Sequence, residues 1–260
     1  MPESFHPARM VLALACAGLA SRGASAQQDT VYSLDAGTER AALRWDVRDA
    51  TWWSSRVQLD ARRSDGSGWF VGAESQKRDR DTDTGLAAGM YGRAGPWVWS
   101  GQVAAAPGSR FLPRYSVEPQ LGYQVGRTVF EGGLVYRSFP ESTVRIGTVG
   151  LVHYVGDSEL GLRFAMGRSQ PGARDVRVVT VRGLLDRGGP WTFGATASAG
   201  KGLYDILNVP GVSGNRGWSA SVNARYRIDP RHSIRFELGA GRERPSFRET
   251  RVGLSFRKTF

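Results

Sequence analysis

The chain has 260 residues, a formal net charge of +11, 34 glycines and a mean hydropathy of −0.34. After residue 26 no stretch approaches about 18 uninterrupted apolar residues, which excludes a bundle of transmembrane helices. The arginines are spread along the chain instead of gathered in one helix or arm, so the charge does not indicate a nucleic-acid-binding protein.

The first 26 residues have the three parts of a secretory signal peptide. Arg9 supplies a positive first region, residues 10–19 an apolar middle region, and Ala24-Ser25-Ala26 a cleavage site. We therefore predict a signal peptide over residues 1–26 and a mature exported domain over residues 27–260. The single cysteine, Cys16, lies in the signal peptide, so the mature chain is predicted to have no disulfide.

A two-residue alternation of apolar and polar side chains runs through most of the mature chain. In the last ten residues Val252, Leu254 and Phe256 alternate with Arg251 and Arg257. A strand with one apolar and one polar face is typical of a barrel with lipid outside and a wet lumen inside. In chain order, similar segments are residues 57–63, 69–76, 115–124, 128–138, 144–155, 159–166, 218–228 and 233–240. Residues 176–185 are apolar on both faces and fit least well.

The connections between these segments alternate in length. Compact turns rich in Gly, Asp and Pro are predicted at residues 65–68, 93–96, 126–127, 156–157, 186–190 and 229–231. Longer connections are predicted at residues 50–54, 77–83, 106–114, 139–142, 169–174, 202–217 and 242–247. Short periplasmic turns and longer outer loops are typical of outer-membrane barrels. The sequence therefore predicts an all-β, transmembrane, antiparallel up-and-down β-barrel of about 14 strands. The alternative count is 12, because residues 30–49 are either one strand or a poorly ordered lead-in.

Aromatic residues fall near the predicted strand ends, as in the girdles that mark a membrane interface. The residues assigned to these girdles are Trp69, Trp97, Trp191, Trp218 and Phe260, with Trp52, Trp53 and Trp99 nearby in the same pattern. A soluble β-sandwich also alternates, but it needs neither a signal peptide nor a terminal phenylalanine.

The order of several soft motifs resembles the YaiO-like outer-membrane β-barrel family. The residues that carry the resemblance are Thr51-Trp52-Trp53, residues 57–62 and 69–78, the hairpin 121–139 with Tyr136-Arg137-Ser138-Phe139, Tyr154-Val155-Gly156 and the closing strand. The resemblance covers essentially the whole mature chain. It implies a barrel in the outer membrane of a Gram-negative cell, and it implies little about activity.

Two turns contain fragments similar to serine-hydrolase motifs. Ser158 would attack an ester, His232 would accept its proton and Asp229 would orient the imidazole. The same residue types are favoured in tight turns, and no set of oxyanion donors accompanies them. A lipid- or ester-active barrel is therefore the least favoured alternative, and we expect no enzyme and no cofactor.

The triplet Asp79, Asp81 and Asp83 lies in a predicted outer loop, where carboxylates could bind calcium weakly. Arg78 and Arg80 alternate with the acids and oppose such a site. A solvated run of charges is the favoured interpretation, and no metal site is expected.

The polar face predicted to line the lumen is rich in arginine. The residues expected to line a pore or contact a solute are Arg137, Arg145, Arg163, Arg225, Arg227, Arg235, Glu237, Arg251 and Arg257. An arginine-rich wall favours anions. The leading prediction is therefore a porin-like passive channel or binding barrel for a polar, anionic solute, with saccharides as one class. The alternative is a closed structural or assembly barrel whose outer loops bind a partner.

The predicted location also defines the expected partners. They are the lipid and lipopolysaccharide of the outer membrane, and the barrel-assembly machinery acting on the strand that ends in Phe260. Nucleic acid is not among them.

Overall fold

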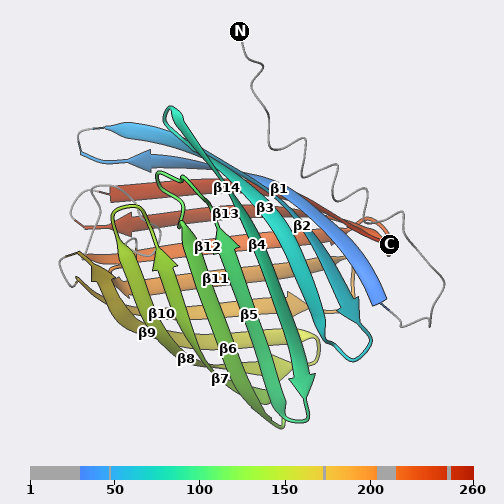
Figure 1. The fold of residues 1–260 in the computed structure, drawn as a ribbon. Coiled ribbons are helices and arrows are strands. Elements are labelled where there is room, and N and C mark those ends of the chain that lie inside the picture. The colour runs from blue at the N-terminus through green and yellow to red at the C-terminus, as the bar shows by residue number, and fades with distance from the viewer. Residues whose placement is uncertain (1–29, 47, 172–173, 204–214, 245–246) are drawn as a thin grey trace.

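A computed structural model describes residues 30–46, 48–171, 174–203, 215–244 and 247–260. The predicted signal peptide lies outside these residues. Within them, antiparallel strands form one closed barrel in which each strand pairs with its neighbours in the chain and β1 pairs with β14 (Figure 1). The strands are β1 (Thr30–Arg44), β2 (Asp49–Arg63), β3 (Gly68–Arg78), β4 (Asp81–Ala94), β5 (Trp97–Ala105), β6 (Tyr115–Val125), β7 (Thr128–Ser138), β8 (Thr143–Val155), β9 (Ser158–Gln170), β10 (Arg174–Asp186), β11 (Trp191–Lys201), β12 (Arg216–Arg227), β13 (His232–Glu243) and β14 (Phe247–Thr259). No helix in the described ranges is long and apolar enough to cross a membrane.

Closure of the ladder confirms the predicted barrel and its count of 14 strands. Residues 30–44 form a full strand that pairs with both β2 and β14, so the 12-strand alternative is wrong. Because the ladder returns to β1, no strand edge is left unpaired, which is the condition for placing backbone amides in lipid.

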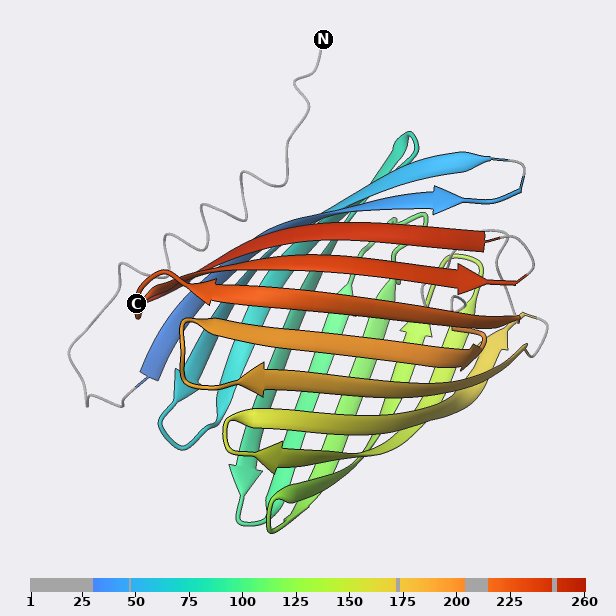
Figure 2. The same cartoon turned by 180° about the vertical axis from the view of Figure 1, so that it is seen from behind.

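The predicted turns and loops lie at opposite ends of the barrel. We call the end with the short turns, where β1 begins and β14 ends, the turn end (Figure 2). There the amide of Phe260 donates to the carbonyl of Tyr32 at 2.9 Å. Two of its turns contain glycines in the left-handed region, Gly126 at φ 57° and Gly156 at φ 62°. The opposite end is the loop end.

Two of the predicted loops differ from the structure. The connection predicted at residues 77–83 is only Asp79 and Arg80, because β3 extends to Arg78 and β4 begins at Asp81. Residues 50–54 were expected to form the first outer connection, but they lie inside β2, and the connection falls between Arg44 and Asp49. The reason is that Trp52 and Trp53 alternate between the two faces of a strand. Trp53 is exposed on the outside, whereas Trp52 is only 8% exposed and points into the barrel. The prediction of Trp52 as a girdle residue is therefore wrong.

The outer surface is apolar along the middle of the strands and aromatic near their ends. Leu134, Val149 and Leu238 are each more than half exposed, as expected of side chains that face lipid. The predicted girdle residues are also exposed on this surface: Trp69, Trp97, Trp191 and Phe260 near the turn end and Trp218 near the loop end.

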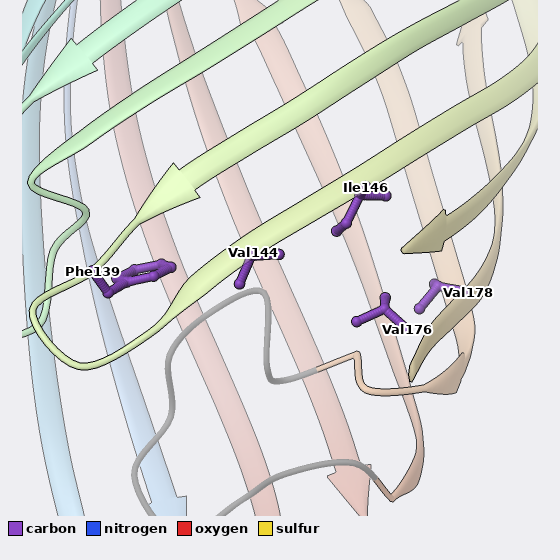
Figure 3. Packing of buried hydrophobic residues seen from close by; sticks show 5 residues of the cluster. All are labelled: Phe139, Val144, Ile146, Val176 and Val178. Carbon is purple, nitrogen blue, oxygen red and sulfur yellow. The ribbon is translucent and has the colours of Figure 1, made fainter. Parts of the chain in front are cut away.

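The lumen carries an apolar cluster near the loop end. It consists of Phe139, Val144, Ile146, Val176 and Val178, all at most 5% exposed (Figure 3). These inward valines explain why residues 176–185 look apolar on both faces. They also reverse the usual polarity of β8, so that Arg145, between Val144 and Ile146, points outward.

Close packing behind this cluster makes one glycine sensitive to substitution. Gly167 lies opposite Ile146 in the β8–β9 ladder, and a Cβ atom there would lie 2.7 Å from the Ile146 Cα. We expect Gly167→Ala to destabilise the barrel by about 1–3 kcal/mol through overpacking. The measurement is the temperature at which the folded band disappears in semi-native electrophoresis. Gly101→Ala is the matched control, because nothing lies within 4 Å of its added Cβ; an equal effect of both changes would contradict the packing explanation.

Candidate functional site in the barrel lumen

The alternation of each strand, fixed by the register, decides which predicted residues face the lumen. The structure places these on the lumen face: Arg137, Arg163, Arg225, Arg227, Arg235, Glu237, Arg251 and Arg257. Arg145 is exposed on the outer surface, with its guanidinium 5.6 Å from the centre of the Tyr136 ring. The prediction of Arg145 as a lumen residue is therefore wrong.

Carboxylates are about as numerous as arginines on the lumen face of the described strands. The acids are Asp35, Glu39, Asp60, Glu74, Asp81, Asp83, Glu118, Glu131, Glu159, Asp186, Glu237, Glu243 and Glu249. The arginines are Arg56, Arg62, Arg78, Arg93, Arg137, Arg163, Arg174, Arg182, Arg225, Arg227, Arg235, Arg251 and Arg257. Sequence reasoning missed many of the acids because it did not carry the alternation through β1 and to the loop end of β14. The expected excess of arginine is thus not a property of the whole lumen.

Several of these charges pair along the barrel wall. Arg137 Nη2 lies 2.7 Å from Glu118 Oε1, on the neighbouring strand. Arg163 Nη2 lies 2.7 Å from Glu131 Oε1, two strands away. In each pair the two residues lie on neighbouring or nearby strands. These ion pairs therefore hold the charged side chains against the sheet and do not cross the lumen. Pairing also offsets the cost of burying charge.

Four lumen-facing arginines lie close together on three neighbouring strands, and we call them the arginine cluster: Arg225, Arg227, Arg235 and Arg257 on β12, β13 and β14. Arg225 lies directly opposite Arg235, and both Arg227 and Arg257 lie opposite Ser233. Like charges directly opposite each other in a sheet are destabilising. The cluster lies in the half of the lumen nearest the turn end, where these three strands run side by side (Figure 2).

Three carboxylates lie near the arginine cluster: Asp35, Asp186 and Glu237, which follows Arg235 by two residues on the lumen face of β13. Asp35 Oδ2 lies 3.3 Å from Arg257 Nε. Asp186 accepts hydrogen bonds from the Gly188 amide at 2.9 Å and from Thr192 Oγ1 at 3.0 Å. Among the described residues, no carboxylate lies within 4.0 Å of the guanidinium groups of Arg225, Arg227 or Arg235. This arrangement has the chemistry of a site for an anion.

The wall beside the arginine cluster carries many polar, uncharged side chains, together with Arg182 and Asp186 of β10. The uncharged polar residues that face the lumen on β10, β11 and β12 are Thr180, Thr192, Thr196, Ser198, Ser219, Ser221 and Asn223. Thr180 Oγ1 and Ser198 Oγ are 2.9 Å apart. Hydroxyl and amide groups both donate and accept hydrogen bonds, so this wall is suited to a polar solute that passes the cluster.

At the loop end, residues 106–114 fold into the lumen. Asp83 is 5% exposed and its carboxylate accepts the backbone amides of Arg110, Phe111 and Leu112 at 2.9, 2.7 and 2.9 Å. The Arg78 guanidinium lies 4.0 Å from the Trp52 ring centre and 4.5 Å from that of Phe111. The loop is therefore fixed to the inner wall, and it narrows the loop end beside a lumen cavity of about 430 Å³.

The hydrolase fragments are not brought together. Ser158 begins β9 and exchanges hydrogen bonds with the backbone of Asp186, whereas His232 begins β13. Three strands lie between them in the barrel order. The aspartates of the predicted charge run also diverge: Asp83 anchors the loop, Asp81 pairs with Arg110, and Asp79 lies 4.0 Å from Arg48.

The Asp229 carboxylate has a structural role in its turn. Hydrogen bonds from the His232 ring at 2.8 Å and from the Arg231 amide at 2.7 Å lower its pKa below the ordinary value of 3.8. A carboxyl with a lowered pKa in the folded state stabilises the fold above its unfolded pKa, and this stability is lost as pH falls through the folded pKa. We expect thermal stability to fall below about pH 4, and Asp229→Asn to remove part of that fall. Equal acid sensitivity in both proteins would contradict this role.

Comparisons with known proteins agree with the fold. Residues 33–205 match the family model described as the YaiO membrane beta barrel domain. No curated protein sequence matches the chain. Among solved structures, a mutant of the monoaromatic hydrocarbon channel TodX has a TM-score of 0.57 at 9% identity, over 90% of this chain and 91% of that chain. The monoaromatic hydrocarbon channel CymD has a TM-score of 0.50 at 12% identity, over 90% and 89%. At such identities these likenesses show the fold alone.

Proposed function

The chain belongs to the YaiO membrane beta barrel family, and from that premise we propose that it is a passive outer-membrane channel or binding barrel for polar, anionic solutes. The observation that carries the proposal is the Arg225–Arg235 pair. The two side chains lie opposite each other on the lumen wall, with no described carboxylate within 4.0 Å. Lumen cations are the usual basis of anion preference in membrane pores.

The distribution of charge in the lumen supports a preference for anions over cations. The wall pairs that join Arg137 to Glu118 and Arg163 to Glu131 leave little net charge along β6 to β9. The arginine cluster is thus the part of the lumen that attracts an anion most strongly, and the hydroxyl-bearing wall next to it offers hydrogen bonds. Saccharides that carry carboxylate or phosphate groups combine both features.

Single-channel recording tests the proposal. We expect the refolded protein in a planar bilayer to give discrete current steps, and its reversal potential in a salt gradient to show anion preference. A folded barrel that gives no current, or one that prefers cations, would contradict it.

A closed barrel is the second candidate, and one observation favours it. Leu203, which follows β11, packs against the apolar cluster of Phe139 and Val144 and also against a second cluster that includes Leu43 and Phe247. Contacts with both clusters place this residue across the loop end of the lumen, in addition to the fixed loop 106–114. A silent protein whose loops bind a partner would support this candidate.

A further inference from the structure

Arg145 is not the only arginine exposed on the lipid-facing surface. Near the loop end, six successive strands from β10 through β14 to β1 each carry an exposed cation on this surface. They are Arg177, Lys201, Arg216, Arg242, Arg248 and Arg44, and we call them the cation belt. On β10 to β14 each cation continues a mainly apolar lipid-facing row; Arg242, for example, follows Leu238 and Ala240 on β13. The row on β1 differs, because Arg40 and Thr38 precede Arg44 on the same face.

The ladder places cations of the belt directly opposite one another. Arg242 lies opposite Arg248, and Arg248 lies opposite Arg44. Lys201 lies opposite both Arg177 and Arg216. Side chains in such positions are about 5 Å apart at Cβ, and like charges there repel. An anion from outside the chain would relieve this repulsion along the six strands.

Carboxylates of the protein form ion pairs with only two of the six cations. Asp49 lies 3.3 Å from Arg44, and Asp175 lies 3.8 Å from Arg177. Within the part of the chain that the structure describes, no carboxylate lies within 4.0 Å of Lys201, Arg216, Arg242 or Arg248. Glu243 and Glu249, which are close in sequence, are buried on the lumen face and are separated from the belt by the sheet.

The height of the belt identifies the anion. Trp218, an exposed girdle residue, lies opposite Arg242 and two residues from Arg216 on the same face. Girdle tryptophans mark the headgroup level of a membrane. The cations therefore lie at or just beyond the headgroups of the leaflet at the loop end. Near the turn end the same face carries Trp191, Tyr226 and Phe256 with the single cation Lys258 on these strands, so the two leaflets meet different surfaces.

We propose that the cation belt binds the phosphate groups of a phosphorylated glycolipid in the outer leaflet, with its acyl chains against the apolar rows below. Opposed arginine pairs suit this ligand, because each guanidinium presents several N–H donors in a fork that matches phosphate oxygens. A soluble phosphate has no reason to prefer this face, whereas a lipid satisfies both its cations and its apolar rows. This proposal rests on the barrel fold and is independent of whether the lumen conducts.

The test compares two opposed arginine pairs that share β13. Arg242→Gln/Arg248→Gln removes a pair on the lipid face, and Arg225→Gln/Arg235→Gln removes a pair on the lumen face. Binding of bisphosphorylated lipid A to the refolded protein in detergent is measured by native mass spectrometry. We expect the first variant to bind about 25-fold more weakly, since each cation near an anionic headgroup contributes about 1 kcal/mol, or about fivefold. The lumen variant should bind as the wild type does.

Three controls keep the result specific. Heat-modifiable electrophoretic mobility establishes that each variant is folded. Arg242→Lys/Arg248→Lys should restore part of the binding, because lysine keeps the charge without the guanidinium fork. Fully dephosphorylated lipid A should bind weakly to every variant. Unchanged binding in the lipid-face variant, equal binding of the dephosphorylated lipid, or complete displacement of lipid A by an equimolar amount of inorganic pyrophosphate would overturn the proposal.

Discussion

Replacing Arg225 and Arg235 together with glutamine is expected to abolish most of the anion preference of the conductance while leaving the barrel folded. Both guanidinium groups lie on the lumen wall without a described carboxylate at ion-pair distance, so they raise the positive potential of that region. The measurement is the reversal potential of single channels in a salt gradient, compared with the wild type.

The same double variant should be slightly more stable than the wild type. Removing two like charges that face each other across β12 and β13 relieves repulsion of about 0.2–1 kcal/mol. Loss of selectivity with a gain in stability is the result expected of residues kept for function. Arg242→Gln/Arg248→Gln is the matched control for selectivity, because it removes an opposed pair from the lipid face. An equal loss of anion preference in the control would assign the effect to net charge instead of to the lumen.

Replacing Asp83 with alanine is expected to release residues 106–114 from the lumen. Three buried or half-buried backbone amides lose their acceptor, so we expect a loss of about 3 kcal/mol in stability and a larger single-channel conductance. Thermal unfolding and current amplitude measure the two effects.

Asp81→Ala is the control for Asp83→Ala. Asp81 also contacts the loop, through Arg110, but both side chains of that pair are largely exposed. Exposed pairs contribute less than about 1 kcal/mol. If Asp81→Ala raises the conductance as much as Asp83→Ala does, the loop is held by charge in general and not by the three amide bonds.

The strand count and the turns were predictable because lipid imposes a strict pattern. A residue such as Leu238 has no alternative to facing outward, and turns such as Gly126-Arg127 require glycine at a positive φ. Local sequence carries both signals.

The errors in the sequence-based predictions occur where the lumen is apolar, or where the contact joins residues that are far apart in the sequence. Val144 and Ile146 pack inside, so the alternation in β8 was assigned with the wrong phase and Arg145 was placed in the lumen. Trp52 was assigned to the interface because a tryptophan near a strand end usually lies there. The loop anchor at Asp83 joins residues 27 to 29 positions apart, and no local pattern indicates which carboxylate a loop will contact.

The two faces of β12 to β14 present arginine in different settings. Inside, the arginine cluster lies in the half near the turn end; outside, the cation belt lies at the loop end. We propose that the first acts on a solute in the lumen and the second on lipid headgroups. Variants that separate the two effects are therefore available on the same strands.

Thiol labelling at Ser233 tests the central claim most directly. Ser233 faces the lumen opposite both Arg227 and Arg257. In the protein used for labelling, the sole natural cysteine, Cys16, is replaced by serine. In proteoliposomes, the Ser233→Cys thiol should react faster with a thiosulfonate reagent that carries a negatively charged sulfonate group than with one that carries a positively charged trimethylammonium group. Added salt should reduce the difference between the two reaction rates. The lipid-facing control Leu238→Cys should react with neither. A Ser233→Cys thiol that is unreactive, or that reacts faster with the cationic reagent, would contradict a water-filled, anion-attracting lumen.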